Sequence, residues 1–312
     1  MEMLFTNSDY HAYGGRVVAM PHFVGTLAFL TSWLAWNPTF RVWSPQSKLN
    51  FFVHRRDAIG RHIAKYGTHE PLLTKWLSDY LSAAQPGLFI DVGANLGWHA
   101  LHAARHHAIE TVVAFEPDEF NASLLDRNRS LNGINNIVIK NCAVGAERGL
   151  ARFYRYKDSN LGRHSMVTDY GYGSRIVPIT TLDTAIVELG LDDRPVAVLK
   201  IDVEGYEPAV IVGASQTLKR ANVVIVEYSP DLNRVSGLST DDMIVRLCDA
   251  GLTPFVLQTT GGISCVDIDK LRAFEGQLDV IWIRTAASVN EVARVGDLLK
   301  LAAANKLVVK PI

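Results

Sequence analysis

Short apolar runs that alternate with helical stretches dominate the chain from residue 86 onward. Near-continuous Val, Ile and Leu runs between helices are typical of a mainly parallel sheet whose two faces are both covered by helices. One predicted helix lies in each of the two gaps between the first three runs. The expected strands are Leu88–Val92, Thr111–Phe115, Ile137–Val144, Val196–Val203, Val223–Tyr228, Thr253–Leu257 and Leu278–Ile283, and the two helices are Trp98–His107 and Glu119–Leu131.

The segments on either side of these runs follow other patterns. Apolar positions three and four apart predict helices over residues 57–84, interrupted at Gly67 and Pro71. Residues 148–191 form a long polar insertion, which we expect to be functional because structureless loops beyond about 15 residues are uncommon. The chain therefore divides into an N-terminal extension with lid helices (1–85), a sheet domain (86–286) and a C-terminal helix (287–312), centred on Val289–Asn305.

Composition narrows the class of protein. Hydrophobic residues make up 48% of the 312 residues and charged residues 20%, which excludes an intrinsically disordered chain. The formal net charge of -1 argues against a nucleic-acid-binding protein. Three distant cysteines, Cys142, Cys248 and Cys265, predict neither a disulfide framework nor a zinc site. Their spacing suits a reducing compartment, so we expect a cytoplasmic protein.

One segment of the N-terminal extension is uncharged. Val17–Phe40 contains no Asp, Glu, Lys or Arg and exceeds the roughly 20 residues that cross a bilayer. Pro21, Gly25 and several hydroxyl residues lower its hydropathy, and no basic region precedes it as in a signal peptide. Three interpretations remain: a lid or packing helix, which is favoured, an interfacial helix that brings the protein to a membrane, and a membrane span.

The strongest local motif is FIDVGANLGWHA, residues 89–100, in which a strand ends at Asp91 and turns through Gly93 and Gly97 into a helix. Backbone N–H groups at such a helix start can closely contact a ligand. The G-x-x-x-G spacing disfavours a dinucleotide or nucleoside triphosphate and favours a small ligand with its own carboxylate and ammonium. A purely structural role remains open, because tight strand–helix turns need glycine in any case.

An acidic residue ends the next predicted strand. Glu116 follows Gly93 by 23 residues, and a carboxylate at this place accepts hydrogen bonds from a ribose cis-diol. The alternative is an ordinary exposed glutamate at a strand end. Because Glu116 would lie near Asp91 and the glycine turn, the sequence favours a ribose contact.

Charged side chains also end the fourth and fifth strands. In LKIDVEGYE, Lys200, Asp202 and Glu204 share one face of an extended chain, and VIVEYSP places Glu227 and Tyr228 at the same rim. A lysine and carboxylates on an apolar strand are costly to bury unless they pair or bind a ligand. The cluster is therefore a candidate catalytic or substrate site, or else an internal ion-pair network.

Taken in order, FIDVGANLGWHA, FEP, NCAVG, TTLDT, LKIDVEGYEP and VIVEYSP resemble the FkbM family of S-adenosylmethionine-dependent methyltransferases. The resemblance runs from about Asn50 to Arg284 and includes Arg55–Pro71. It implies a Rossmann-like class I methyltransferase fold, α/β with a seven-stranded, mainly parallel sheet and helices on both faces. It also implies transfer of a methyl group to a hydroxyl of a sugar, a glycan or a secondary metabolite.

The resemblance assigns roles to individual residues. Its implied contacts with S-adenosylmethionine are Glu70, Asp91, Gly93, Asn95, Gly97, Glu116, Cys142, Ala143 and Val144. Asp202 is the first candidate for the base that deprotonates the acceptor, with Lys200 beside it, and His164 is the second. Glu204, Glu227 and Tyr228 would contact the acceptor. Oxygen ligands for a divalent metal are present without a diagnostic spacing, so a metal is not indicated.

Two other functions remain as alternatives, an RNA 2′-O-methyltransferase and a non-catalytic protein that binds S-adenosylmethionine. The net charge argues against the first, and the set of Asp91, Glu116 and Asp202 argues against the second. We expect a small-molecule or glycan acceptor and no nucleic acid, while the oligomeric state cannot be inferred. The histidines at 99, 102, 106 and 107 are interpreted as structural, and the aromatic loop Tyr170–Gly173 suits either stacking on sugar rings or turning the chain.

Overall fold

The computed structural model describes residues 27, 29–31, 38–157, 159–259 and 261–284. The Val17–Phe40 run lies mostly outside these ranges, and the predicted helix Val289–Asn305 lies wholly outside them. Within the described ranges, none of the helices combines the length and apolar character that a membrane span requires.

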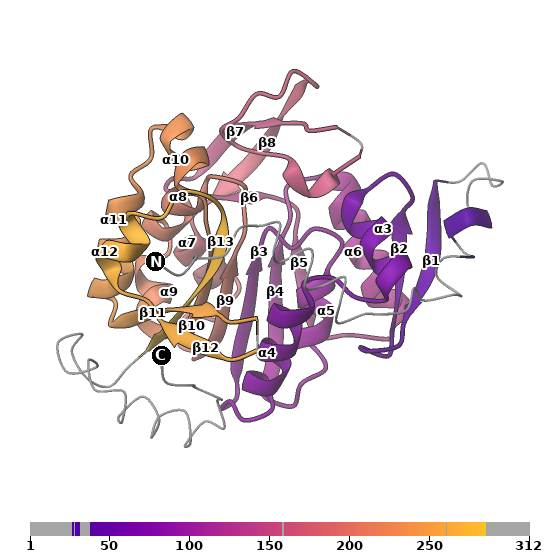
Figure 1. Cartoon of the computed structure of the whole chain (residues 1–312), viewed down its shortest axis with the longest axis horizontal. Helices are drawn as coiled ribbons and strands as arrows, with labels where there is room; N and C mark the ends of the chain where they lie inside the picture. Colours follow the sequence, from indigo (N-terminus) through magenta and orange to yellow (C-terminus); the bar gives the residue numbers. More distant parts are fainter. Residues whose placement is uncertain (1–26, 28, 32–37, 158, 260, 285–312) are drawn as a thin grey trace.

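An eight-stranded sheet forms the centre of the protein (Figure 1), in the order β12-β11-β13-β10-β9-β3-β4-β5. The strands from β10 to β5 in this order are parallel, whereas β13 runs antiparallel to both β10 and β11. The predicted mainly parallel sheet is confirmed, with eight strands instead of seven because the short β12 is added at one edge. The strands are β3 (Gly87–Val92), β4 (Ile109–Phe115), β5 (Ile137–Lys140), β9 (Val196–Ile201), β10 (Ala221–Tyr228), β11 (Leu252–Leu257), β12 (Ile263–Cys265) and β13 (Leu278–Arg284).

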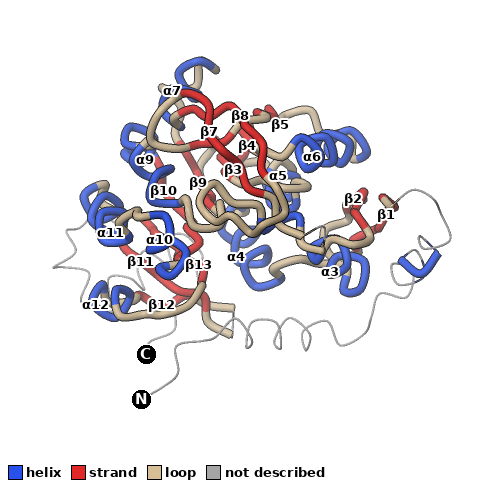
Figure 2. Tube along the Cα trace, turned by 90° about the horizontal axis from the view of Figure 1, so that it is seen from above, coloured by secondary structure: helices blue, strands red, loops and turns tan. Residues whose placement is uncertain are grey.

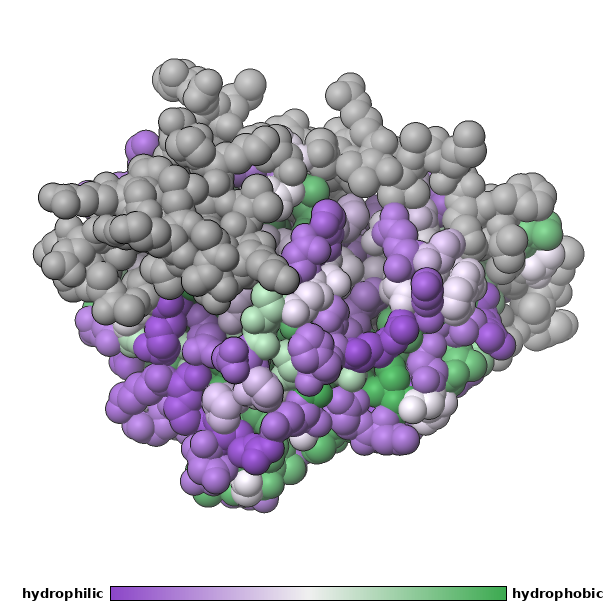
Figure 3. Space-filling model, turned by 90° about the horizontal axis from the view of Figure 1, so that it is seen from below, coloured by the Kyte–Doolittle hydropathy of each residue, from purple (hydrophilic) through white to green (hydrophobic). Residues whose placement is uncertain are grey.

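Helices cover both faces of this sheet, as predicted. Side chains that alternate along β3 enter two separate cores, Phe89 on one face and Leu88 and Ile90 on the other. In Figure 3, which views one side of the molecule, hydrophilic side chains cover most of the described surface. The first face carries the hairpin β1 (Thr39–Ser44) and β2 (Leu49–His54), α3 (Ala58–Tyr66), α4 (Pro71–Leu81), α5 (Trp98–Ala103) and α6 (Glu119–Leu131). The second carries α7 (Leu182–Glu188), α8 (Glu207–Val212), α9 (Ser215–Arg220), α11 (Thr240–Asp249) and α12 (Ile268–Arg272), and α10 (Pro230–Ser236) contacts α11.

The predicted single strand Ile137–Val144 is wrong. The chain turns after Lys140, where the Cys142 N–H donates to the Lys140 carbonyl and the Asn141 side chain donates to the Glu116 carbonyl at 2.8 Å. The remainder, β6 (Ala143–Val144), joins β7 (Gly149–Tyr154) and β8 (Ser174–Thr180) in a second sheet. Figures 1 and 2 show this three-stranded sheet above the carboxyl ends of the central strands. Much of the polar insertion is thus ordered structure.

Asp57 ties the N-terminal extension to the insertion. Its Oδ2 caps α3 by accepting from the Gly60 N–H at 2.9 Å, and its Oδ1 accepts from the Leu161 N–H at 2.7 Å. The Asn121 side chain donates to the Leu161 carbonyl at 3.2 Å. The N–H and the carbonyl of Leu161, which begins the short 3₁₀ turn Leu161–Arg163, are therefore both satisfied by distant side chains.

We expect Asp57→Ala to lower the free energy of unfolding by about 2–4 kcal/mol. Loss of the cap costs about 0.5–2 kcal/mol, and the buried Leu161 N–H left without a partner costs about 1–3 kcal/mol. Ser239→Ala is the matched control, because Ser239 caps α11 at the surface through the Asp242 N–H. Urea unfolding should show a loss of only about 1 kcal/mol for the control. Equal losses in the two variants would contradict the role of Asp57 in holding the insertion.

Candidate functional site

A cleft opens at the carboxyl ends of β3, β4 and β9 and is also lined by residues of the insertion. Ligand sites in open α/β sheets commonly occur at this edge. Six of the nine predicted cofactor residues line it: Gly93, Asn95, Glu116, Cys142, Ala143 and Val144. The insertion contributes Phe153, Leu161, Gly162, His164 and Met166, and Asp202 closes the side towards β9.

The turn after β3 brings two strand ends together. Gly93 has a φ of 90°, and a Cβ atom there would lie 1.9 Å from the Asp202 carbonyl oxygen. Gly97 has a φ of 91°, and a Cβ atom there would lie 2.6 Å from the Leu101 side chain. Both conformations favour glycine, so the motif is explained by its backbone. Gly97 does not line the cleft but allows α5 to begin close to α6.

Glu116 is fixed at the floor of the cleft. Its Oε2 accepts from the Asn95 N–H and its Oε1 from the Asp118 N–H, each at 2.8 Å. The residue is 5% exposed, and burial raises its pKa to about 8 despite these two donors. A carboxylate held by two backbone groups is well placed to meet a ligand hydroxyl.

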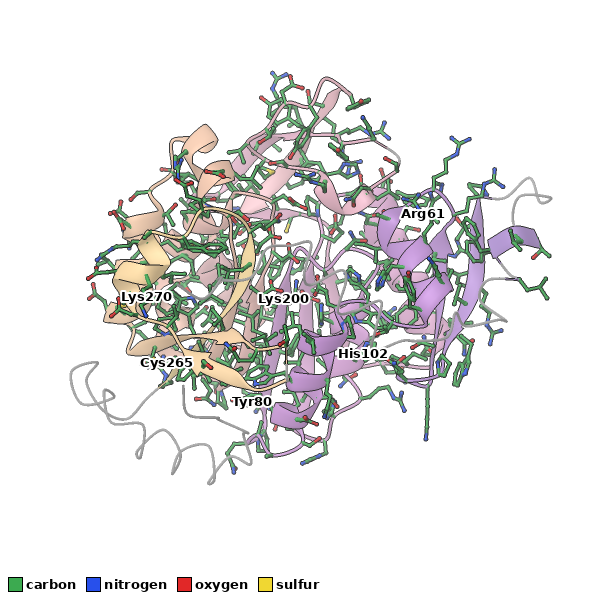
Figure 4. All side chains as sticks on the ribbon, in the orientation of Figure 1. Arg61, Tyr80, His102, Lys200, Cys265 and Lys270 are labelled. Carbon is green, nitrogen blue, oxygen red and sulfur yellow. The ribbon has the colours of Figure 1, made fainter. Side chains whose placement is uncertain are left out.

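A buried lysine lies at the centre of the charged cluster (Figure 4). Lys200 in β9 is 3% exposed, its Nζ lies 2.7 Å from Asp202 Oδ2, and Asp91 is its register partner on β3. Burial alone would lower the pKa of Lys200, but the carboxylates of Asp202, Glu70 and Asp91 raise it above its usual value. Lys200 is therefore charged, and it holds Asp202 at the mouth of the cleft.

Asp91 and Glu70 lie behind the cleft lining. Asp91 is 1% exposed, and neither of its oxygens accepts a hydrogen bond from any residue that the structure describes. Glu70 adopts a left-handed φ of 45°, and its Oε2 lies 2.7 Å from Nε2 of His99. Burial opposes ionisation of Glu70, but His69 and His99 hold the pKa of this carboxyl below its usual range.

His99 contacts Glu70 behind the cleft lining, which the sequence interpretation does not predict. It was grouped with three other histidines as structural, and His102 does fit that description, since it is packed between Phe51 and Trp98. His99 differs because it begins the helix after the glycine turn and faces Glu70, from a segment 29 residues earlier. Its position immediately after the turn was the available signal.

His164 lines the cleft with its ring, but its nitrogens face protein groups. Nδ1 accepts from the Tyr156 N–H at 2.8 Å, and Nε2 lies 3.9 Å from Asp118 Oδ2. The side chain is 3% exposed. Arg175 also contacts Asp118, at 2.6 Å, so this part of the cleft is a fixed polar wall.

The predicted acceptor residues separate into two groups. Glu204 is near Asp202, and burial followed by the Asp202 charge raises its pKa to about 8. Glu227 accepts a hydrogen bond from Gln277 and is paired across the sheet with Asp279, whose pKa burial also raises to about 8.

Tyr228 does not belong to the site, because it is 2% exposed and packs in the second core. Asp279 was not predicted, although a charged residue in an apolar strand was a usable signal.

The side chains in and behind the cleft suit a nucleoside-containing ligand that carries a positive charge. Glu116 offers a carboxylate to hydroxyl groups, Phe153 and Val144 offer apolar surface to a base, and Asp91 is a buried carboxylate without a hydrogen-bond donor among the described residues. Within the described ranges, no cluster of three or more His, Cys, Asp or Glu residues could hold a metal ion.

Comparisons with known proteins agree with the motif resemblance. A family model described as the methyltransferase FkbM domain matches residues 91–252, just over half of the chain. Hexuronic acid methyltransferase AglP of Haloferax volcanii is 28% identical over 171 residues, covering 55% of this chain and 65% of that protein. Methyltransferase 1 of Beauveria bassiana is 22% identical over 194 residues, covering 58% and 73%. A solved S-adenosylmethionine-dependent methyltransferase from Agrobacterium tumefaciens has a TM-score of 0.43 at 10% identity, covering 80% of this chain and 72% of that one.

We expect Gly93→Ala to abolish the cleft, because the added Cβ atom would overlap the Asp202 carbonyl and the backbone would remain strained at positive φ. Gly133→Ala is the control: its φ is 64°, and no described atom lies within 4 Å of an added Cβ. The control should lose about 1–2 kcal/mol of unfolding free energy, measured in urea, and Gly93→Ala clearly more. A Gly93→Ala protein as stable as the control would refute the close approach of β3 and β9.

Proposed function

This chain belongs to the FkbM methyltransferase family, and we propose that it transfers the methyl group of S-adenosylmethionine to a hydroxyl of a sugar. One observation carries the proposal. Asp202, ion-paired with the buried Lys200, lines the same cleft as Gly93 and Glu116, so a candidate base adjoins a candidate nucleoside site.

The residues of the cleft fit the cofactor. Glu116 would accept hydrogen bonds from the ribose hydroxyls, Cys142, Ala143 and Val144 would contact the adenine, and the Gly93–Asn95 turn would hold the methionine half. Glu70 supplies negative charge behind this turn, and Asp91 lies there with both oxygens lacking donors among the described residues. Gly97 would contribute through the backbone at the start of α5. When bound, S-adenosylmethionine supplies a methyl group on a sulfonium that leaves as a neutral thioether.

Asp202 would act as the general base. Its side chain is 27% exposed, so a hydroxyl in the cleft can reach it, and Lys200 Nζ holds its Oδ2 at 2.7 Å. The acceptor hydroxyl gives its proton to Asp202 as its oxygen gains the methyl group. His164 is the weaker candidate for the base, because both of its ring nitrogens face protein groups. The remaining rate enhancement arises from alignment of the reacting groups, which can lower the activation barrier by about 7–11 kcal/mol.

A sugar is the acceptor class that the observations favour. Glu204 and Glu227 lie close enough to Asp202 for its charge to raise their pKa values, and carboxyl oxygens accept hydrogen bonds from hydroxyl groups. The printed name of the Haloferax volcanii relative describes methylation of a hexuronic acid. The match spans 65% of the length of that relative, so the substrate in its name indicates the class of acceptor and not the individual sugar.

At about pH 9, where Glu116 with its pKa of about 8 is ionised, we expect Glu116→Gln to weaken S-adenosylmethionine binding by about 10–100-fold, because a charge-assisted hydrogen bond contributes about 1.5–3 kcal/mol. Isothermal titration calorimetry of the whole chain measures this change. Glu119→Gln, an exposed substitution three residues away, should bind like the wild type. KM values of enzymes usually lie between about 1 μM and 1 mM. If the wild-type protein gives no binding heat at ~100 μM S-adenosylmethionine, the cofactor proposal is wrong.

For Asp202→Asn, we expect kcat to fall by about 10²–10⁴-fold, the usual contribution of a general base. The dissociation constant for S-adenosylmethionine should change less than about threefold. Transfer of a radiolabelled methyl group to a sugar acceptor measures kcat, and Asp192→Asn, at an exposed position, is the charge-matched control. Wild-type turnover in Asp202→Asn would eliminate Asp202 as the base.

A further inference from the structure

Glu204 is held in a conformation that disfavours its residue type. Its φ is 52°, in the left-handed region, although it carries a Cβ atom. The fully buried Glu207 braces this turn by accepting from the Val203 N–H at 3.0 Å and the Gly205 N–H at 3.1 Å. From the insertion, the Ser165 hydroxyl donates to the Glu204 carbonyl at 2.9 Å. Strain that is enforced from several sides is a frequent mark of a functional position.

The side chain of Glu204 has hydrogen-bonding capacity to spare. It is 13% exposed, and its buried Oε2 accepts no hydrogen bond from the residues that the structure describes. Arg163 Nε lies 3.8 Å from this oxygen, too far for a hydrogen bond. Arg163 itself is 39% exposed. The pair therefore presents an acceptor and a set of donors side by side, next to Asp202.

Aromatic rings from the insertion surround this pair. The Arg163 guanidinium lies 5.2 Å from the ring centre of Tyr156, and Tyr170 packs edge-on against Tyr156 at 4.8 Å. Tyr172 lies 6.2 Å from Tyr156 and is 48% exposed. Burial and then the nearby Glu204 carboxylate raise the pKa of Tyr170, which ties the aromatic group to the strained turn.

The geometry points to a sugar-ring subsite formed by Glu204, Arg163, Tyr156 and Tyr170. One hydroxyl of the ring donates to the partly exposed carboxyl group of Glu204, and the neighbouring hydroxyl oxygen accepts from Arg163, because a paired acceptor and donor match two adjacent hydroxyls. The tyrosines pack against the apolar C–H face of the ring. Asp202 lies two residues before Glu204, so this diol would sit beside the hydroxyl that is methylated. The inference rests on the proposed function and narrows the acceptor to a pyranoside with free vicinal hydroxyls.

Other acceptor classes match these residues poorly. A monohydric phenol could pack against the tyrosines but has no second hydroxyl for the Glu204–Arg163 pair. The subsite therefore distinguishes acceptors with two adjacent hydroxyls from acceptors with one.

Direct binding tests the subsite independently of turnover. The full chain, with S-adenosylhomocysteine present, is titrated with p-nitrophenyl β-D-glucoside and p-nitrophenyl β-D-glucuronide, with 4-nitrophenol as the comparison that lacks the sugar; ligand-observed NMR gives the dissociation constants. We expect at least one glycoside to bind more tightly than 4-nitrophenol. Glu204→Gln and Tyr170→Ala should each weaken that glycoside about tenfold or more. Arg152→Ala, on the exposed face of the same insertion, should leave it unchanged.

Glu204→Gly separates a binding role from a structural one. Glycine adopts a positive φ without strain, so the thermal unfolding temperature should stay the same or rise while glycoside affinity is lost. S-adenosylmethionine affinity should stay within about twofold. A lowered unfolding temperature with unchanged glycoside affinity would overturn the subsite, as would equal binding of 4-nitrophenol and the glycosides. The proposed function fails separately, if the wild type neither binds S-adenosylmethionine nor methylates any hydroxyl acceptor.

Discussion

The charge of Lys200 constrains most of the site. A buried ammonium costs several kcal/mol unless opposite charges surround it, and this one lies in the middle of the central sheet. Its carboxylate neighbours come from separate elements: Asp202 from the end of its own strand, Asp91 from the adjacent strand and Glu70 from the start of α4. The packing of α4 on this face of the sheet therefore brings Glu70 close to Lys200. The Lys200 ammonium group also fixes the orientation of Asp202. One buried charge therefore affects both the packing of these elements and the position of the candidate base.

Two turns at the carboxyl edge adopt positive φ by different means. After β3, Gly93 has no Cβ atom, so the chain can approach the Asp202 carbonyl closely. After β9, Glu204 retains its side chain, and the buried Glu207 together with Ser165 holds the turn. The first solution gives close approach of backbone to backbone, and the second keeps a carboxylate next to Asp202 at the cost of strain. Methyl transfer depends on alignment within a fraction of an ångström, and rigid turns of this kind provide it.

Local patterns predicted the elements whose residues contact their sequence neighbours or lie in regular strands. The helix Glu119–Leu131, the glycine turn and the strand-end position of Glu116 were all found where the sequence predicted them. The strand Ile137–Val144 was wrong because tertiary hydrogen bonds at Lys140 and Glu116 turn the chain, which apolar periodicity does not reveal. Tyr228 follows Glu227 at a strand end, but the alternation of side chains points it into the opposite core.

By itself the sequence determined the class of the fold, the edge of the sheet where the cleft lies and most of the predicted residues that line this cleft. These properties depend on the succession of strands and helices along the chain, on side-chain alternation and on glycine positions, which are local. Only the tertiary structure decided which carboxylates surround Lys200, that His99 faces Glu70, and that the insertion brings Arg163 and the tyrosines to Glu204. Such contacts join residues far apart along the chain, and they form because buried charges must find partners in three dimensions.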